Sequence, residues 1–248
     1  MGSKGNKRHL KRLATPGHLQ IARKERSAGS FFINARPGAH SKKFSLPLGH
    51  IVRDLLKLSK NTRESKYILN SDKVLIDGKP KRDHRLPVGM MDVIEIPEIA
   101  KTYRVLPSRK HGLIISEITK EESKFKLCKV KDISTIKGGD FQLHLHDGRN
   151  ILVKPEEISK YQTRGSVKIS LPDQEILEYY PLVEGNQAII EAGKNIGVAG
   201  RIAKLTTRFG VNASIAEIES KTGENISTAY DYAFVIGTDT SSIDLPME

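Results

Sequence analysis

The fold is decided most clearly by residues 141–153, which read FQLHLHDGRNILV. In this stretch apolar residues occupy alternate positions on both sides of a turn, namely Phe141, Leu143 and Leu145, then Ile151 and Val153. Alternation with a period of two is typical of strands that bury one face, and Asp147-Gly148 is a hairpin turn signal. Further alternation at Val167 and Ile169 extends the pattern. We therefore expect a central β domain over residues 106–178.

The C-terminal block, residues 179–248, also predicts short strands. Apolar runs at 188–190, 202–205, 215–218 and 234–236 are separated by glycine-rich segments. Such spacing favours a small β barrel. Its glycines at 193, 197 and 200 superficially resemble a phosphate-binding loop, but the Lys-Ser/Thr ending is missing and no helix pattern follows. We interpret them as structural turn residues.

The block upstream of the central domain, residues 44–105, predicts two helices on a small sheet. Residues 44–60 have apolar positions on one helical face, with Ser45 as the expected N-cap. A second helix is expected from Asn61 or Thr62, with residues 67–69 facing inward. Strands are expected at 74–76 and 93–96, the first running into the hairpin turn Asp77-Gly78 and the second following a turn at 87–89.

The N-terminal 43 residues form a basic arm, with eleven Lys or Arg against one acid, Glu25. A segment so charged and so poor in apolar residues is expected to be disordered until a polyanion neutralises it. The charge is concentrated in the front half, because residues 1–111 carry a net charge of +16 and the remainder −4. Nucleic acid, and RNA in particular, is therefore the expected partner. Phe31 and Phe32 have two open interpretations, stacking on bases or anchoring the arm.

Composition argues against several other classes of protein. The single cysteine, Cys128, excludes an intrachain disulfide and indicates a reducing compartment; we expect a small buried residue. No apolar run reaches the length of a membrane helix. His144 and His146 share a strand face but lack a third ligand at recognisable spacing, so no metal is expected. No nucleophile elbow or paired catalytic carboxylates occur, and neither an enzyme activity nor a cofactor is expected.

The candidate RNA contacts are the cations of the front half. Arg53, Lys57 and Lys60 stand at i, i+4 and i+7 of the predicted first helix, where they would follow a phosphate backbone. An ordinary solvated face is the alternative. The full candidate set is Lys4, Lys7, Arg8, Lys11, Arg12, Arg23, Lys24, Arg26, Arg36, Lys42, Lys43, Arg53, Lys57, Arg63, Lys66, Lys79, Lys81 and Arg82.

Four segments carry a resemblance to a known family. They are residues 7–12 (KRHLKR), residues 77–79 with 87–94 (DGK and PVGMMDVI), residues 124–130 (KFKLCKV) and the glycine-spaced block at 193–202. In this order the chain resembles the archaeal and eukaryotic small-subunit ribosomal protein "S-four-e" family over essentially its whole length. The last segment looks like a KOW motif.

The resemblance implies an α+β protein in four parts. These are a basic arm (1–43) that orders on ribosomal RNA, an alpha-L RNA-binding module (44–105), a central β domain (106–178) and a KOW-type SH3-like barrel (179–248). It also implies a structural constituent of the small ribosomal subunit, cytoplasmic and ribosome-bound, which binds ribosomal RNA beside neighbouring ribosomal proteins and supports subunit assembly and translation. No small-molecule substrate or membrane partner is implied.

Three points stay open. KOW modules often contact RNA, but residues 184–248 hold five basic residues against nine acids. Whether the barrel meets RNA, a protein neighbour or solvent is therefore open. Alpha-L modules also occur in pseudouridine synthases and tyrosyl-tRNA synthetases, which makes an RNA-modifying or RNA-ligating enzyme one rival. A free KOW-containing transcription or translation factor is the other.

Overall fold

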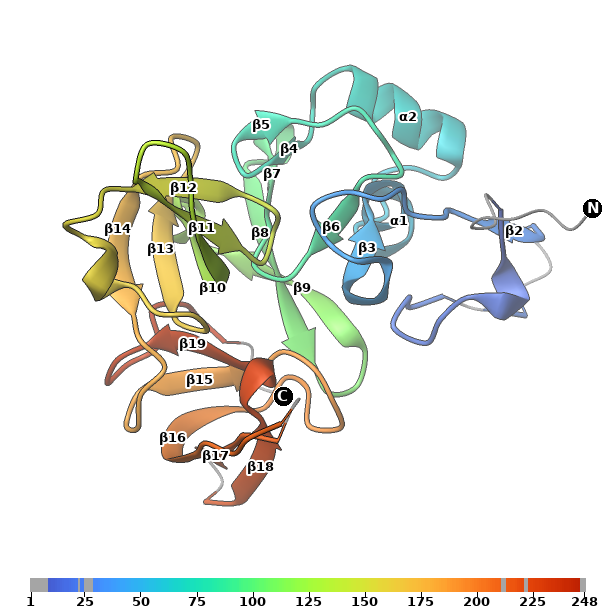
Figure 1. Cartoon of the computed structure of the whole chain (residues 1–248). Helices are drawn as coiled ribbons and strands as arrows, with labels where there is room; N and C mark the ends of the chain where they lie inside the picture. The colour runs from blue at the N-terminus through green and yellow to red at the C-terminus, as the bar shows by residue number, and fades with distance from the viewer. Residues whose placement is uncertain (1–8, 22, 25–28, 211–212, 221–222, 246–248) are drawn as a thin grey trace, which may run out of the picture.

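The computed structural model describes residues 9–21, 23–24, 29–210, 213–220 and 223–245. Within these residues the strands form three five-stranded and two two-stranded sheets, and helix is limited to short segments. The fold is therefore α+β with few helices and many strands (Figure 1). None of the described helices is long and apolar enough to cross a membrane. Single 3-10 turns connect the strands: η1 (Arg12–Ala14), η3 (Lys42–Phe44), η5 (Pro97–Ile99), η6 (Glu122–Lys124), η7 (Ile158–Lys160) and η8 (Tyr230–Tyr232).

The described part of the basic arm is folded. Strand β1 (Leu10–Lys11) pairs with β2 (Phe31–Phe32), and Phe32 and Leu19 are buried in the main core. These contacts are absent from the sequence prediction, because a charge count does not register the few apolar side chains that pack against distant parts of the chain. The predicted ordering of the arm on RNA stays a prediction. Phe32 is thus an anchor, whereas Phe31 remains exposed.

The predicted helix over residues 44–60 begins later than expected. Its first residues form β3 (Ser45–Pro47), which pairs with β6 (Pro87–Gly89). Helix α1 (Leu48–His50) then widens into the π-helix η4 (Ile51–Leu55). Ser45 is therefore a buried strand residue and no N-cap, and residues 87–89 form a strand where a turn was expected. The pairing joins segments about forty residues apart, so local periodicity could not detect it.

The second helix, α2 (Thr62–Asn70), begins as predicted. The Asn61 side chain accepts a hydrogen bond from the Glu64 backbone N–H at 2.9 Å, which is the N-cap arrangement. Leu69 is fully buried, as expected. Tyr67, however, points away from the core and is 70% exposed, so its predicted inward orientation is wrong.

The first five-stranded sheet has the order β5-β4-β7-β8-β9. Its turn at Asp77-Gly78 is confirmed, since both residues are left-handed, with φ of 51° and 73°, as a tight two-residue hairpin requires. The sheet continues beyond residue 105 through its two longest strands. The strands are β4 (Leu75–Ile76), β5 (Lys79–Pro80), β7 (Val93–Ile96), β8 (Lys101–Ser108) and β9 (Gly112–Ile118).

The second sheet, in the order β12-β11-β10-β13-β14, contains the predicted hairpin. Leu143 lies opposite Ile151, and Phe141 lies opposite Val153. This sheet has a small apolar core of its own, which includes Cys128 as predicted. The strands are β10 (Phe125–Thr135), β11 (Phe141–Leu145), β12 (Asn150–Val153), β13 (Ser166–Ser170) and β14 (Ile176–Tyr180).

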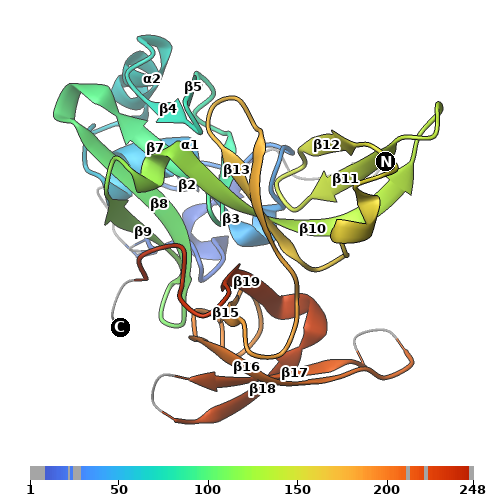
Figure 2. The same ribbon diagram turned by 90° about the vertical axis from the view of Figure 1, so that its left-hand side faces the viewer.

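The third sheet has the order β18-β17-β16-β15-β19 and lies below the other two in Figure 2. Its glycines are structural, as predicted: a Cβ on Gly200 would lie 2.0 Å from the Glu219 carbonyl oxygen. One apolar cluster contains Leu106, Ile190 and Phe234, so this sheet and the first share a core. The strands are β15 (Gln187–Ile190), β16 (Ala199–Thr206), β17 (Ile215–Ser220), β18 (Asn225–Ala229) and β19 (Ala233–Gly237).

Candidate nucleic-acid interface

The outer face of α2 carries two of the predicted cations. Arg63 and Lys66 are three residues apart, which places them on neighbouring turns of one face, and both are exposed. Neither forms an ion pair with any residue that the structure describes. The opposite face buries Ser65 and Leu69. The helix therefore presents positive charge outward from a fixed apolar base.

Other predicted cations are also available to a ligand. Lys81 is partly exposed and, within the described chain, unpaired. The remaining members of this group are exposed. They come from the arm, from the end of the first helical segment and from β5, and they are Lys11, Arg23, Lys24, Lys42, Lys43, Lys57 and Lys79. Lys4, Lys7, Arg8 and Arg26 lie outside the described residues.

Four predicted arginines are instead engaged with the protein. Arg12 is buried, and its Nε donates to the Gly29 carbonyl at 3.2 Å. Arg36 pairs with Asp83 at 3.1 Å, and Arg82 holds Asp72 through two hydrogen bonds of 2.9 and 2.6 Å. The exposed ion pairs at Arg36 and Arg82 are weak enough for a phosphate to displace the carboxylate.

Arg53 differs most from its prediction. Its guanidinium donates to Asp54 at 2.8 Å and to the Thr62 hydroxyl at 3.0 Å, and lies 5.9 Å from the Phe32 ring centroid. Only 15% of its side chain is exposed. The π-helix η4 and the left-handed Lys57 (φ 54°) end the regular helix, so Arg53, Lys57 and Lys60 do not form one helical stripe.

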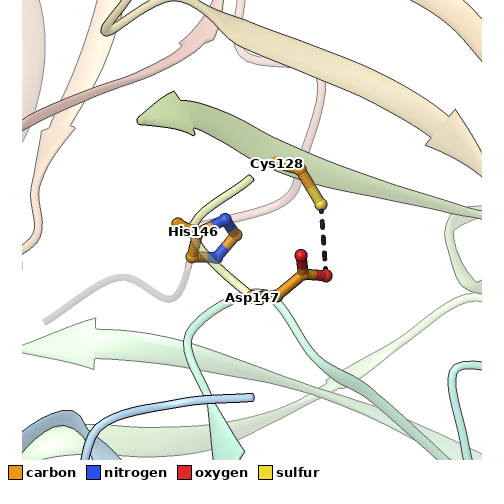
Figure 3. A group of neighbouring side chains, drawn as sticks. All are labelled: Cys128, His146 and Asp147. Atoms are coloured by element: carbon orange, nitrogen blue, oxygen red, sulfur yellow. Dashed lines mark hydrogen bonds between the residues drawn. The ribbon is translucent and has the colours of Figure 1, made fainter. Parts of the chain in front are cut away.

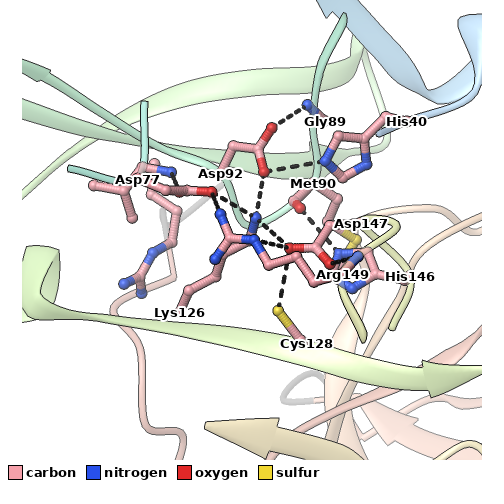
Figure 4. Close-up of polar contacts among 12 residues, drawn as sticks. His40, Asp77, Gly89, Met90, Asp92, Lys126, Cys128, His146, Asp147 and Arg149 are labelled. Carbon is pink, nitrogen blue, oxygen red and sulfur yellow. Dashed lines mark hydrogen bonds and ion pairs between the residues drawn. The ribbon is translucent and has the colours of Figure 1, made fainter. Parts of the chain in front are cut away.

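Sequence reasoning missed a buried ion cluster where the first two sheets meet (Figure 4). Its centre is Lys126 on β10, whose ammonium nitrogen Nζ lies 3.0 Å from Asp77, 2.5 Å from Asp92 and 3.0 Å from Asp147. Only 1% of the lysine side chain is exposed. The ion cluster consists of His40, Asp77, Asp92, Lys126, Asp147 and Arg149.

The ion cluster joins five segments of the chain. Arg149 pairs with Asp77 and, at 3.2 Å, with Asp147, while His40 from the end of the arm lies 3.0 Å from Asp92. Asp77 and Asp92 also accept backbone N–H bonds of 2.9 and 2.8 Å. Burial alone would lower the pKa of Lys126, but Asp92 and Asp77 raise it well above the ordinary value. The lysine is therefore charged, and its ammonium group is surrounded by the carboxylates of the cluster.

The carboxylates of the ion cluster make acid stability testable. Burial would raise the pKa of Asp147, but Lys126 and its other charged neighbours lower it to about 2. A carboxylate whose pKa is lower in the folded than in the unfolded protein stabilises the fold at pH values above its unfolded pKa, which is near 4. This stabilisation is lost as the pH falls toward 2. We expect this single group to account for about 2 kcal/mol of the decrease in the free energy of unfolding between about pH 5 and about pH 2. Urea unfolding at both pH values measures this decrease, which should be about 2 kcal/mol smaller in Asp147→Asn than in the parent chain. Equal decreases in the two proteins would contradict the prediction.

Cys128, His146 and Asp147 lie within ligand distance of one another (Figure 3). The His146 Nδ1 accepts from the Lys129 backbone N–H at 3.2 Å, so its Nε2 carries the proton and donates to the Met90 carbonyl at 3.2 Å. Burial lowers the pKa of His146 to about 3 and raises that of Cys128, which donates its S–H to Asp147 at 3.6 Å. Both groups are neutral and already bonded, so the trio fits a structural role better than an ion.

His144 is likewise engaged on both ring nitrogens, with Ser134 and Asn150 at 2.8 Å each. It shares no bonding partner with His146, so the two histidines predicted to share a strand face do not converge on one site.

A cavity of about 810 Å³ lies where the three sheets approach one another. Two of its cations are neutralised, since Lys129 pairs with Glu191 at 3.1 Å and Arg164 pairs with Asp231 at 2.5 Å. A third, Lys131, has no ion-pair partner among the described residues. Two histidines also line it: His146 is neutral and engaged on both ring nitrogens, and His40 lies 3.0 Å from Asp92. The cavity therefore offers fewer unpaired cations than the described surface of the front half.

Two family models match the chain. The model described as Ribosomal family S4e matches residues 99–176, and the model described as RS4NT (NUC023) domain matches residues 4–43. Together they cover the arm and most of the central sheet.

Curated proteins match over nearly the full length. The small ribosomal subunit protein eS4 of Methanocaldococcus jannaschii is 43% identical over 250 residues, covering 99% of this chain and 100% of that protein. The protein of the same name from Methanothermobacter thermautotrophicus is 41% identical over 246 residues, covering 99% of both. The crystal structure of the 30S ribosomal protein S4e from Thermoplasma acidophilum is similar with a TM-score of 0.66 at 34% identity, covering 78% of this chain and 95% of that one.

Proposed function

The chain belongs to the ribosomal family S4e and is a structural constituent of the small ribosomal subunit, and we propose that it holds ribosomal RNA through the exposed cations of its N-terminal half. The observation that carries this proposal is the separation of charge. Residues 1–111 have a net charge of +16, and the remainder has −4. Within the described front half, most lysines of the candidate set have no carboxylate partner.

Such cations bind phosphates by position and not by base sequence. The outer face of α2 and the exposed Lys79 of β5 lie on the same module, whose apolar core and N-cap hold them in place before RNA arrives. Preorganised charge of this kind lowers the entropy that binding must overcome. We assign residues 1–43 to the arm, 44–105 to an alpha-L module, 106–178 to a central β domain and 179–248 to a KOW-type barrel.

The neighbours of the chain follow from the same charge distribution. The acidic C-terminal block favours a protein neighbour or solvent over a phosphate backbone, because like charges repel. The exposed Phe209 lies in the loop that follows β16. We therefore propose ribosomal RNA as the partner of the front half, with a neighbouring small-subunit protein or solvent facing the back half, in the cytoplasm.

Sedimentation separates a ribosomal constituent from a free factor. We expect a tagged chain, expressed in an archaeal host and fractionated at low magnesium to separate the subunits, to peak with the small subunit. Because buried protein contacts and many phosphate contacts act together, the peak should persist after a moderate salt wash. A peak at the top of the gradient would mean a free factor and would also reopen the enzyme alternative.

A further inference from the structure

Tyr67 is the most exposed tyrosine of the chain. It projects from α2 with 70% of its surface open, whereas the next, Tyr232, is 37% exposed. Its ring makes no aromatic or cation–π contact with a described residue, and its hydroxyl forms no hydrogen bond with one. The other tyrosines pack, as in the T-shaped pair Tyr161–Tyr179. A flat apolar ring is therefore left facing outward on a helix that is otherwise amphipathic.

The surroundings of this ring are cationic. Arg63 lies four residues before Tyr67 on the same face, and Lys66 directly precedes it; both are exposed. Asn70, three residues later, completes the face with an exposed polar amide. The one acid of the helix, Glu64, has its carboxylate oxygens occupied by the Lys60 backbone N–H at 2.7 Å and the Asn61 side chain at 2.9 Å.

We infer that Tyr67 is a stacking platform for an unpaired RNA base whose flanking phosphates are held by Arg63 and Lys66. An aromatic face next to two cations matches a nucleotide, which combines a flat π system with an anion. A base inside a duplex is already stacked, so the target is a bulge, a loop or a single-stranded segment. This inference rests on the proposed function and adds to it a contact with a base.

A protein partner fits the face less well. A stable protein interface needs a broad apolar centre with few charges, and this face offers one ring between charged and polar side chains. The capped helix also fixes the ring relative to the two cations, as a stacking site requires.

The test uses the full chain and the small-subunit ribosomal RNA of M. jannaschii, transcribed in vitro, in equilibrium filter binding. Tyr67→Ala is expected to lower affinity about 5- to 150-fold, the range for losing one base–aromatic stack. Tyr67→Phe should bind within about twofold of the parent, because the ring is kept. Neither change alters charge, so the slope of log K against log salt should be unchanged. Phe209→Ala, which removes an exposed aromatic side chain from the loop that follows β16, is the control and should have no effect.

A second probe isolates stacking. On a 12-nucleotide single-stranded RNA, Tyr67→Ala should weaken binding, while on an abasic strand of equal length and charge it should not. Tyr67→Ala binding the ribosomal RNA as tightly as the parent would overturn the inference and leave the proposed function intact, as would equal losses on the normal and abasic strands. Absence of ribosomal RNA binding by the parent chain would overturn both.

Discussion

Replacing Lys126 with Met is expected to lower the free energy of unfolding by about 3–5 kcal/mol, the cost of removing one partner from a buried ionic network. The ammonium group lies within 3.0 Å of three carboxylates, and Met has a similar length without the charge. The carboxylates of Asp92 and Asp147 would remain almost inaccessible to water, with 6% and 2% of their side chains exposed. Chemical denaturation of the full chain, followed by circular dichroism, measures the loss.

The matched control lies on the same strand. Lys131 is five residues further along β10, is exposed, and has no ion-pair partner among the described residues. Lys131→Met should change stability by no more than about 0.5 kcal/mol. If Lys126→Met proved as stable as this control, the ion cluster would not be a structural element of the fold.

Affinity for naked ribosomal RNA is expected to fall by about 10³ to 10⁵ between 50 and 200 mM salt, if six to ten phosphates are neutralised. Reversing two charges on α2, in Arg63→Glu with Lys66→Glu, should reduce the slope of log K against log salt by about 1.4 to 1.8, since each lost contact removes about 0.7 to 0.9. Both side chains are exposed, so the fold should tolerate the change. Filter binding across a salt series measures the slope.

The control for that slope has the same charge change elsewhere. Lys137 and Lys154 belong to the central domain, are exposed and form no ion pair within the described chain. Changing both to Glu should leave the slope within error of the parent. A flat salt response of the parent chain, or equal slopes for the two double variants, would refute the assignment of phosphate contacts to α2.

Turns and helix starts, which depend on residues close together in the sequence, are the features that the sequence predicts reliably. The turn at Asp77-Gly78 and the hairpin around Asp147-Gly148 depend on two adjacent residues and on alternation nearby, and both are present. The start of α2 after its N-cap Asn61 is equally local, because the cap side chain and the backbone N–H that donates to it lie three residues apart. Ser45 shows the limit: its strand partner is Gly89, and no pattern near residue 45 contains that information.

The candidate site divides in the same way. The charge count correctly predicts exposed lysines in the front half, because charge density is a property of composition. Counting could not separate Arg63, which is free within the described chain, from Arg53, which is held by Asp54 and Thr62. Nor could it reveal the ion cluster, whose contacts to Lys126 span 34 and 49 residues. Periodicity predicts that Tyr67 faces the core, because it does not distinguish an aromatic residue that packs from one that projects.

The position of Lys126 has a consequence for biosynthesis. Ribosomes make chains from the N-terminus, so Asp77 and Asp92 leave the exit tunnel before the lysine that neutralises them. Lys126 lies 34 residues after Asp92. Until it has been synthesised, the carboxylates of Asp77 and Asp92 lack the ammonium group of β10 that neutralises them in the folded protein. The turn that carries Asp77 and the segment that carries Asp92 can therefore be fixed to β10 only after the middle of the chain has been translated.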